Sequence, residues 1–253
     1  MSRYSLVIWS VAAVLHLLIL IRAIRASILT KYYSFYAYVF TALVGEILLY
    51  ALWVERPASY EKTYWALQFI TLLVGCGIIL EIFRHALAPY PGAEKFGTIV
   101  VLAIFGAVFC FTVLYRLLGP PSGAALFELE RNIRTFQAIL LFCILAVTSY
   151  YGIPIGKNLK GMISGYGLYI ATSLVTLAVR SYAGVRFAQA WAYIQPLSLD
   201  LSLAIWLIAL WSYHPNPFPD ATIHLEEDYE ALAARTKRTL GAMRSRLAKA
   251  GRT

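Results

Sequence analysis

Residues 96–115 read FGTIVVLAIFGAVFCFTVLY and contain no charged side chain. A helix that crosses the hydrocarbon core of a bilayer needs roughly 20 predominantly apolar residues, which is the length of this stretch. Four more uncharged runs cover residues 4–21, 63–80, 135–156 and 161–179, and two further runs, 32–54 and 187–219, contain one acid each. The pattern predicts seven transmembrane helices that occupy nearly the whole chain.

The composition is typical of a membrane protein. Of the 253 residues, 60% are hydrophobic and 14% are charged, and the mean hydropathy is +0.67. Because so few charges cannot cover a soluble globular protein of this size, we expect an all-α integral membrane protein with a seven-helix bundle in residues 1–214. It would be a multi-pass protein of the cell membrane, which is the inner membrane if the source is a bacterium. The expected helices span about residues 5–26, 32–54, 63–87, 96–117, 133–154, 161–180 and 189–213.

The first apolar run must also be weighed as a signal peptide. It is long, lacks a small-x-small cleavage pattern and continues to Arg22 and Arg25, so we expect it to remain as the first helix. Lys and Arg are more frequent on the side of the bundle that carries the C-terminal tail, and the tail itself supplies this excess. The positive-inside rule therefore places the N-terminus outside and the C-terminus in the cytoplasm.

The chain beyond the bundle divides into two parts. Residues 215–221 form a Pro-rich spacer, with prolines at 215, 217 and 219, and residues 222–253 are expected to form a basic amphipathic cytoplasmic helix. Its apolar stripe comprises Leu225, Tyr229, Leu232, Thr236, Leu240, Met243 and Leu247. Binding to anionic lipid headgroups is the favoured interpretation, with pairing to a second copy or docking on a membrane-complex partner as alternatives. The basic residues of the tail contribute to the net charge of +9, so this charge does not require nucleic acid as a partner.

Ionisable side chains in the middle of the predicted helices are the best indication of function, because a charge in hydrocarbon is costly unless it is paired, neutral or hydrated. His16 and Asp200 fall near the midplane, Glu46 lies about one turn further out, and Pro196 opens the helix before Asp200. The predicted ligand or ion pocket comprises His16, Glu46, Gln68, Tyr169, Thr172 and Asp200. It would bind a proton, a small cation or the cationic part of a ligand. In the alternative, these residues only pack and satisfy one another.

A second polar group lies where the third apolar run ends, at ILEIFRHALAPYPG, residues 79–92. Glu81, Arg84 and His85 share one helix face there, near Arg22 of the first helix. One interpretation is an interfacial anchor. The other is an inner ionic latch, because an acid and an arginine at the inner end of a third helix resemble the ionic lock of seven-helix receptors.

Cofactors, metals and catalysis are not expected. The stretch LDLSLA, residues 199–204, is similar to the Asp-x-x-x-Lys stretch of microbial rhodopsins, but Ala204 stands where that family has its retinal lysine. His16 and His85 lie at different depths, and Cys76, Cys110 and Cys143 lie inside apolar runs, so neither zinc nor haem nor a disulfide is indicated. No nucleophile, base and oxyanion donor can be assembled from these positions, so the protein is not expected to be an enzyme.

Three functions fit this pattern. The first is a receptor-like or sensor protein, in which a midplane pocket biases the bundle and the cytoplasmic helix responds. The second is a non-catalytic subunit of a larger membrane complex, which the short loops favour. The third is a small proton- or cation-coupled transporter, although the sequence has no clear internal repeat of the kind that carriers often show. A homodimer is compatible with each of them.

Overall fold

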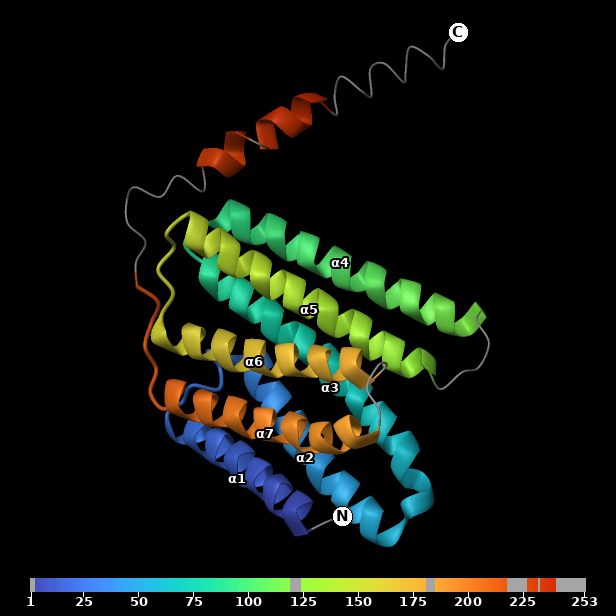
Figure 1. The fold of residues 1–253 in the computed structure, drawn as a ribbon. Coiled ribbons are helices and arrows are strands. Elements are labelled where there is room, and N and C mark those ends of the chain that lie inside the picture. Colours follow the sequence, from blue (N-terminus) through green and yellow to red (C-terminus); the bar gives the residue numbers. More distant parts are fainter. Residues whose placement is uncertain (1–2, 119–123, 181–184, 218–226, 232, 240–253) are drawn as a thin grey trace.

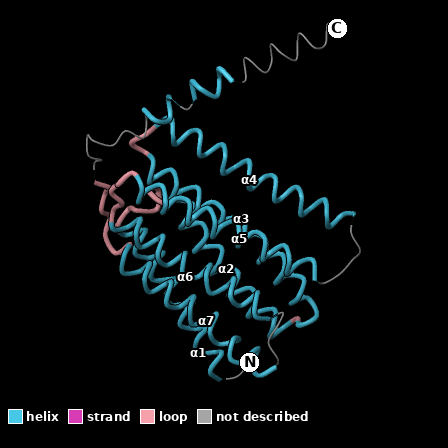
Figure 2. The backbone as a smooth tube through the Cα atoms, turned by 45° about the horizontal axis from the view of Figure 1, so that its top comes forward, coloured by secondary structure: helices cyan, strands magenta, loops and turns pink. Residues whose placement is uncertain are grey.

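The structure, a computed structural model, describes residues 3–118, 124–180, 185–217, 227–231 and 233–239. The described part of the chain is helical without strands, and its long helices run up and down in one bundle (Figures 1 and 2). The helices are α1 (Arg3–Arg25), α2 (Tyr33–Glu55), α3 (Pro57–Leu87), α4 (Pro91–Leu118), α5 (Ala124–Tyr150), α6 (Lys157–Arg180) and α7 (Val185–Ala209). The first six are long and apolar enough to cross a membrane, and α7 contains the shorter apolar stretch Tyr193–Ala209. The protein is therefore an all-helical, multi-pass membrane protein.

Three helices begin at least five residues earlier than the charge pattern predicts. Helix α3 begins at Pro57 rather than near residue 63, and α5 begins at Ala124 rather than near residue 133. Helix α4 likewise starts at Pro91. Proline is favoured in the first helical turn, and charged residues continue a helix into the interface without interrupting its hydrogen bonds. A charge thus marks where hydrocarbon ends, not where the helix ends.

Helix α3 occupies the centre of the bundle, where it contacts α2, α4, α5 and α6. Helix α1 packs between α2 and α7, and α7 packs along α6, whereas α4 lies at the edge against α3 and α5 (Figure 1). We call the end where α7 finishes at Ala209 the tail end, and the end where α1 begins at Arg3 the N-terminal end. Helices α1 and α7 are neighbours in the bundle although they are far apart in sequence.

Aromatic side chains fill the space between α2, α6 and α7. The buried ring of Trp206 lies 5.0 Å from Phe35, 6.1 Å from Tyr38 and 6.4 Å from Tyr166, measured between ring centroids. The first two pairs are edge to face, which is a favoured geometry for aromatic rings. These contacts join α7 to α2 and α6 in the half of the bundle nearest the tail end.

Two glycines allow α6 and α7 to approach closely. A Cβ atom on Gly165 would overlap the indole of Trp206, and one on Gly161 would overlap Ala209. Small residues four apart are a common means of bringing two membrane helices together. The close approach also lets Nε1 of Trp206 donate to the carbonyl of Met162 at 3.3 Å.

Two buried or half-buried asparagine side chains fasten the tail end. Asn158 donates to the carbonyl of Ala209, the last residue of α7, at 2.9 Å and to that of Ser212, just beyond the helix, at 2.8 Å. Its side-chain oxygen accepts from the backbone N–H of His214. We call the contacts of Asn158 and Asn216 the asparagine clasp.

Asn216 makes the second half of the clasp from within the Pro-rich spacer. Its side chain accepts from the N–H of Gly156 at 3.1 Å and donates to the carbonyl of His85 at 2.9 Å. The spacer is therefore bound to the ends of α3 and α6, among the connecting segments that Figure 2 draws together at this end.

Only part of the expected cytoplasmic helix of residues 222–253 is described. Residues 227–231 and 233–239 are helical, and Tyr229 lies 6.0 Å from Phe96 of α4 between ring centroids. The hydroxyl of Tyr151 donates to Asp228 at 3.3 Å. Of the expected apolar stripe, Leu225, Leu232, Leu240, Met243 and Leu247 lie outside the described residues.

The close approach of α6 and α7 predicts a sharp difference between two glycine substitutions. Gly165→Ala should reduce the free energy of unfolding by about 1–3 kcal/mol, because the methyl group overlaps Trp206. Gly106→Ala is the matched control, since a Cβ on Gly106 meets nothing within 4 Å. Unfolding of both purified variants in the same detergent is the measurement. Equal stability of the two variants would contradict the close approach of α6 and α7 at Gly165.

Candidate functional site

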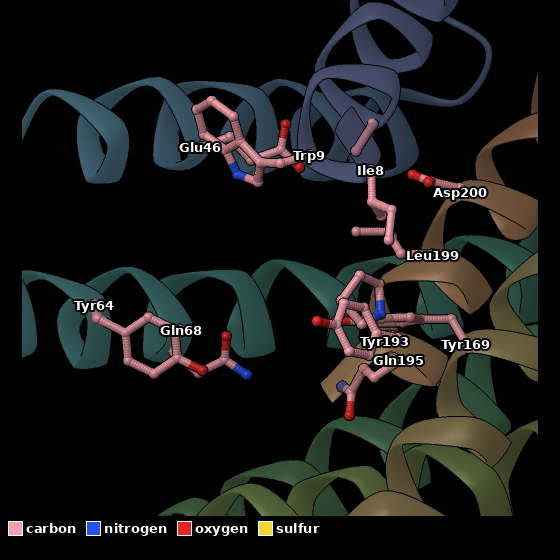
Figure 3. A pocket seen from close by; sticks show the side chains of 12 residues that line it. Ile8, Trp9, Glu46, Tyr64, Gln68, Tyr169, Tyr193, Gln195, Leu199 and Asp200 are labelled. Atoms are coloured by element: carbon pink, nitrogen blue, oxygen red, sulfur yellow. The ribbon is translucent and has the colours of Figure 1, made fainter. Parts of the chain in front are cut away.

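A cavity of about 370 Å³ lies inside the bundle between the middle of the helices and the N-terminal end. Five helices contribute to its wall, namely α1, α2, α3, α6 and α7. The lining residues are Ile8, Trp9, Ala12, Glu46, Tyr64, Gln68, Tyr169, Tyr193, Gln195, Pro196, Leu199 and Asp200 (Figure 3). This volume is at the lower end of the range of small-molecule sites, roughly 300–1,000 Å³.

Two carboxylates face the cavity from different helices. Glu46 comes from α2, and Asp200 comes from α7 one turn after Pro196. In Figure 3 the Asp200 carboxylate points away from α7 into the space beside Ile8, and Glu46 lies next to Trp9. Oε2 of Glu46 and Oδ1 of Asp200 are buried and accept no hydrogen bond from the described residues.

His16 lies behind the cavity wall and is fully buried. Its Nδ1 is 2.9 Å from the carbonyl oxygen of Ala12 and 3.4 Å from Oε2 of Glu46. Because both neighbours are acceptors, Nδ1 carries the hydrogen and donates to the carbonyl of Ala12.

A buried ion pair supports the opposite wall. Nε of Arg134 donates to Oε1 of Glu130 at 2.9 Å, within one turn of α5, and both side chains are almost completely buried. Gln68 donates to the same Glu130 oxygen at 2.7 Å. The Arg134 guanidinium lies 4.9 Å from the ring centroid of Tyr169 and donates to its hydroxyl at 3.3 Å. The pair therefore neutralises itself and holds two side chains of the cavity wall.

Sequence reasoning missed this ion pair, because it assigned Glu130 to the loop before α5. A signal was present. Glu130 and Arg134 are four residues apart, and Gln137, Leu141 and Ile144 continue the same helix face; all five are buried. Polar residues in register with an apolar stripe indicate a buried polar site rather than a loop.

The structure brings four of the six predicted pocket residues to one cavity. Glu46, Gln68, Tyr169 and Asp200 line it, from α2, α3, α6 and α7 respectively. His16 contacts Glu46 from behind the wall. Thr172 does not line the cavity, and its backbone carbonyl accepts from the hydroxyl of Thr176 at 2.7 Å.

The residues of the predicted inner latch lie at the tail end but contact different partners. Glu81 is buried, and its two carboxylate oxygens accept from the backbone N–H groups of Ser34 and Phe35 at 3.1 and 2.9 Å. It thus caps the first turn of α2, where unpaired N–H groups and the helix dipole attract a negative charge. Arg84 instead pairs with Glu94 at 3.2 Å.

His85 and Arg22 are also occupied elsewhere. His85 donates from Nε2 to the carbonyl of Lys31 at 2.9 Å. Arg22 donates to the carbonyl of Trp211 at 2.7 Å and lies 4.9 Å from the Trp211 ring. The structure therefore brings neither Arg22 nor Arg84 into an ion pair with Glu81.

Among the described residues, no group of three or more His, Cys, Asp or Glu side chains is placed to hold a metal ion. The cysteines Cys76, Cys110 and Cys143 are unpaired thiols. No protein-family model matches the chain, and neither a characterised protein nor a solved structure is significantly similar to it. The function has to be inferred from the cavity and its connections.

The buried ion pair predicts a large difference between two acid substitutions. Glu130→Ala should destabilise the fold by about 3–5 kcal/mol, because it leaves Arg134 charged and buried without its partner. Glu94→Ala, which removes the partner of the exposed Arg84, should cost no more than about 1 kcal/mol. Chemical unfolding of both variants is the measurement.

A double substitution completes this test. Glu130→Leu with Arg134→Met removes both charges, so it should recover most of the stability lost in Glu130→Ala. Equal stability of Glu130→Ala and Glu94→Ala would show that the Glu130 and Arg134 charges are hydrated rather than buried.

Proposed function

We propose that the protein is a receptor-like or sensor protein with seven membrane spans, in which a ligand in the cavity acts on α7 and through it on the tail. One observation carries the proposal: Asp200 faces the cavity on the same helix whose last turn is held by the asparagine clasp. A ligand that contacts Asp200 therefore acts directly on the element that leads to the tail.

The proposed topology has α7 as the seventh span, the N-terminus outside and the tail in the cytoplasm. Helix α7 contains 25 residues, a length of about 37 Å at 1.5 Å per residue, which is enough to cross a bilayer. It packs against α1 and α6, beside which Figure 1 draws it. In this orientation the cavity lies in the outer half, away from the tail, and we expect it to be reached from outside.

Helix α7 is one packed connection between the cavity and the tail end. Between Asp200 and Ala209, α7 carries Trp206, which is fully buried against Phe35, Tyr166 and the glycine face of α6. Close-packed interiors respond to a local change by shifting whole elements, since their side chains have little room to absorb it. A displacement at Asp200 would thus reach the clasp and the spacer.

The tail is suited to report such a shift. Its contacts with Phe96 and Tyr151 place it beside the start of α4 and the end of α5. Arg235, Lys237 and Arg238 are exposed on the same segment. These cations favour a tail that also lies on anionic lipid headgroups, as the basic amphipathic sequence suggests.

A proton- or cation-coupled carrier is the second candidate, because His16 and the two cavity acids are titratable groups near mid-membrane depth. Uptake of protons or cations into liposomes that contain the purified protein separates a carrier from a sensor. A partner chain that copurifies in native mass spectrometry would instead favour a subunit of a larger complex.

Neutralising Asp200 should change amide hydrogen exchange at the tail end if α7 couples the cavity to that end. In Asp200→Asn, amide hydrogen exchange at His214 and Gly156, whose N–H groups bind the clasp, should change by about 2- to 30-fold, which corresponds to a coupling of roughly 0.5–2 kcal/mol. Glu61→Gln is the control, since Glu61 is exposed near the start of α3, at the N-terminal end, and does not line the cavity. Unchanged exchange at both amides in a folded Asp200→Asn protein would exclude the proposed coupling.

A further inference from the structure

We infer that the cavity binds an organic ammonium ion, with Asp200 as its counter-ion. This inference rests on the proposed function, because it assumes that the cavity is a ligand site. It adds the chemical class of the ligand, which follows from the balance of charge around the cavity and from the kind of side chains that surround it.

The charge that faces the cavity is negative. Glu46 and Asp200 are the charged side chains among the described lining residues, and no lysine or arginine accompanies them. Arg134 stands close to the wall, but Glu130 matches it at 2.9 Å. Nδ1 of His16 lies 3.4 Å from Oε2 of Glu46. Asp200 forms no ion pair with a described residue, and its buried Oδ1 accepts no hydrogen bond from the described residues.

An unbalanced carboxylate at this depth requires a positive charge, a proton or water. A monovalent cation beside Asp200 would supply this charge. A divalent metal ion does not fit, because calcium takes six to eight oxygen ligands and magnesium six. The described residues offer no group of three or more acids, histidines or cysteines for such an ion.

The remaining wall is aromatic, which suits an organic cation. Trp9, Tyr64, Tyr169 and Tyr193 all line the cavity. Aromatic faces attract ammonium groups electrostatically, and this is how many proteins recognise quaternary ammonium ligands. Tyr169 already binds one cation in this way, since the Arg134 guanidinium lies 4.9 Å from its ring centroid.

Several of these side chains are held in place before any ligand arrives. Trp9 stacks on Tyr50 with 5.1 Å between ring centroids. Gln68 is fixed by its hydrogen bond to Glu130. Gln195 donates to the hydroxyl of Ser173 at 3.2 Å. A wall with fixed side chains loses little entropy on binding, so it can favour one shape and charge of ligand.

Choline and 3,3-dimethyl-1-butanol test the inference, because they have nearly the same shape and differ by the positive charge. The full-length protein in lipid nanodiscs is dialysed to equilibrium against each radiolabelled compound. Choline should bind in a saturable manner, at least about tenfold tighter than the neutral alcohol. Butylammonium and 1-butanol form a second matched pair that extends the test to primary ammonium ions.

Substitutions at Asp200 identify the counter-ion. In Asp200→Asn, the preference for choline over the neutral alcohol, expressed as the ratio of their affinities, should fall by about tenfold or more. Asp200→Glu keeps the charge and should keep this preference. Glu94→Gln should bind as the native protein does. Thermal unfolding of each variant separates loss of binding from loss of fold, and Asp200→Glu keeps the test decisive if Asp200→Asn does not fold.

Two results would overturn the inference. One is equal binding of each cation and its neutral partner, or a cation preference that survives in Asp200→Asn. The other is that neither ammonium compound binds to the folded native protein. Neither result contradicts the proposed sensor function if hydrogen exchange at the clasp still changes in Asp200→Asn. Unchanged exchange at the clasp would count against the sensor function and not against binding of an ammonium ion.

Discussion

Every polar group inside this bundle must find a partner within the protein, because hydrocarbon offers neither hydrogen bonds nor counter-ions. Glu130 and Arg134 satisfy this requirement by pairing with each other. Glu81 satisfies it by capping α2. Asp200 is different, since it is directed into a cavity and part of its carboxylate has no partner among the described residues. The proposed ligand site is built around this carboxylate.

The two ends of the bundle differ in how they are closed. At the tail end, Asn158 and Asn216 join α3, α6, α7 and the Pro-rich spacer through backbone groups. Toward the other end, the helices separate enough to leave a cavity with an acidic and aromatic wall. Helix α7 belongs to both regions. A bundle that is fixed at one end and hollow at the other is suited to transmit a change along the helix that joins them.

The sequence was sufficient to predict a helical membrane protein, because uncharged runs of bilayer length have few other uses. It also led to Glu46, Gln68, Tyr169 and Asp200, since the depth of a residue in an apolar run can be counted directly. These four line one cavity in the structure. Similar depth alone does not bring the four side chains together, because the direction in which each one points also depends on how its helix is rotated about its axis.

Contacts between helices were harder to predict. Glu81 was interpreted through Arg84, its neighbour on the same helix, whereas its partners are the N–H groups at the start of α2. The clasp likewise joins Asn158 and Asn216 to backbone groups distant in sequence. Which groups meet depends on how each helix is rotated about its axis and on where it ends. A local sequence pattern contains neither kind of information. The pair of Glu130 and Arg134 was the exception, because it lies within one helix.

The most direct test of the site is to measure from which side of the membrane the cavity can be reached. A single cysteine at Leu199 in a protein without Cys76, Cys110 and Cys143 is treated with a small membrane-impermeant thiol reagent in sealed vesicles of known orientation. Leu199→Cys should react from the outer face, and Tyr213→Cys, which lies exposed at the tail end, should react from the cytoplasmic face. Reaction of Leu199→Cys from the cytoplasmic face, or from neither face, would contradict an outward-facing ligand cavity.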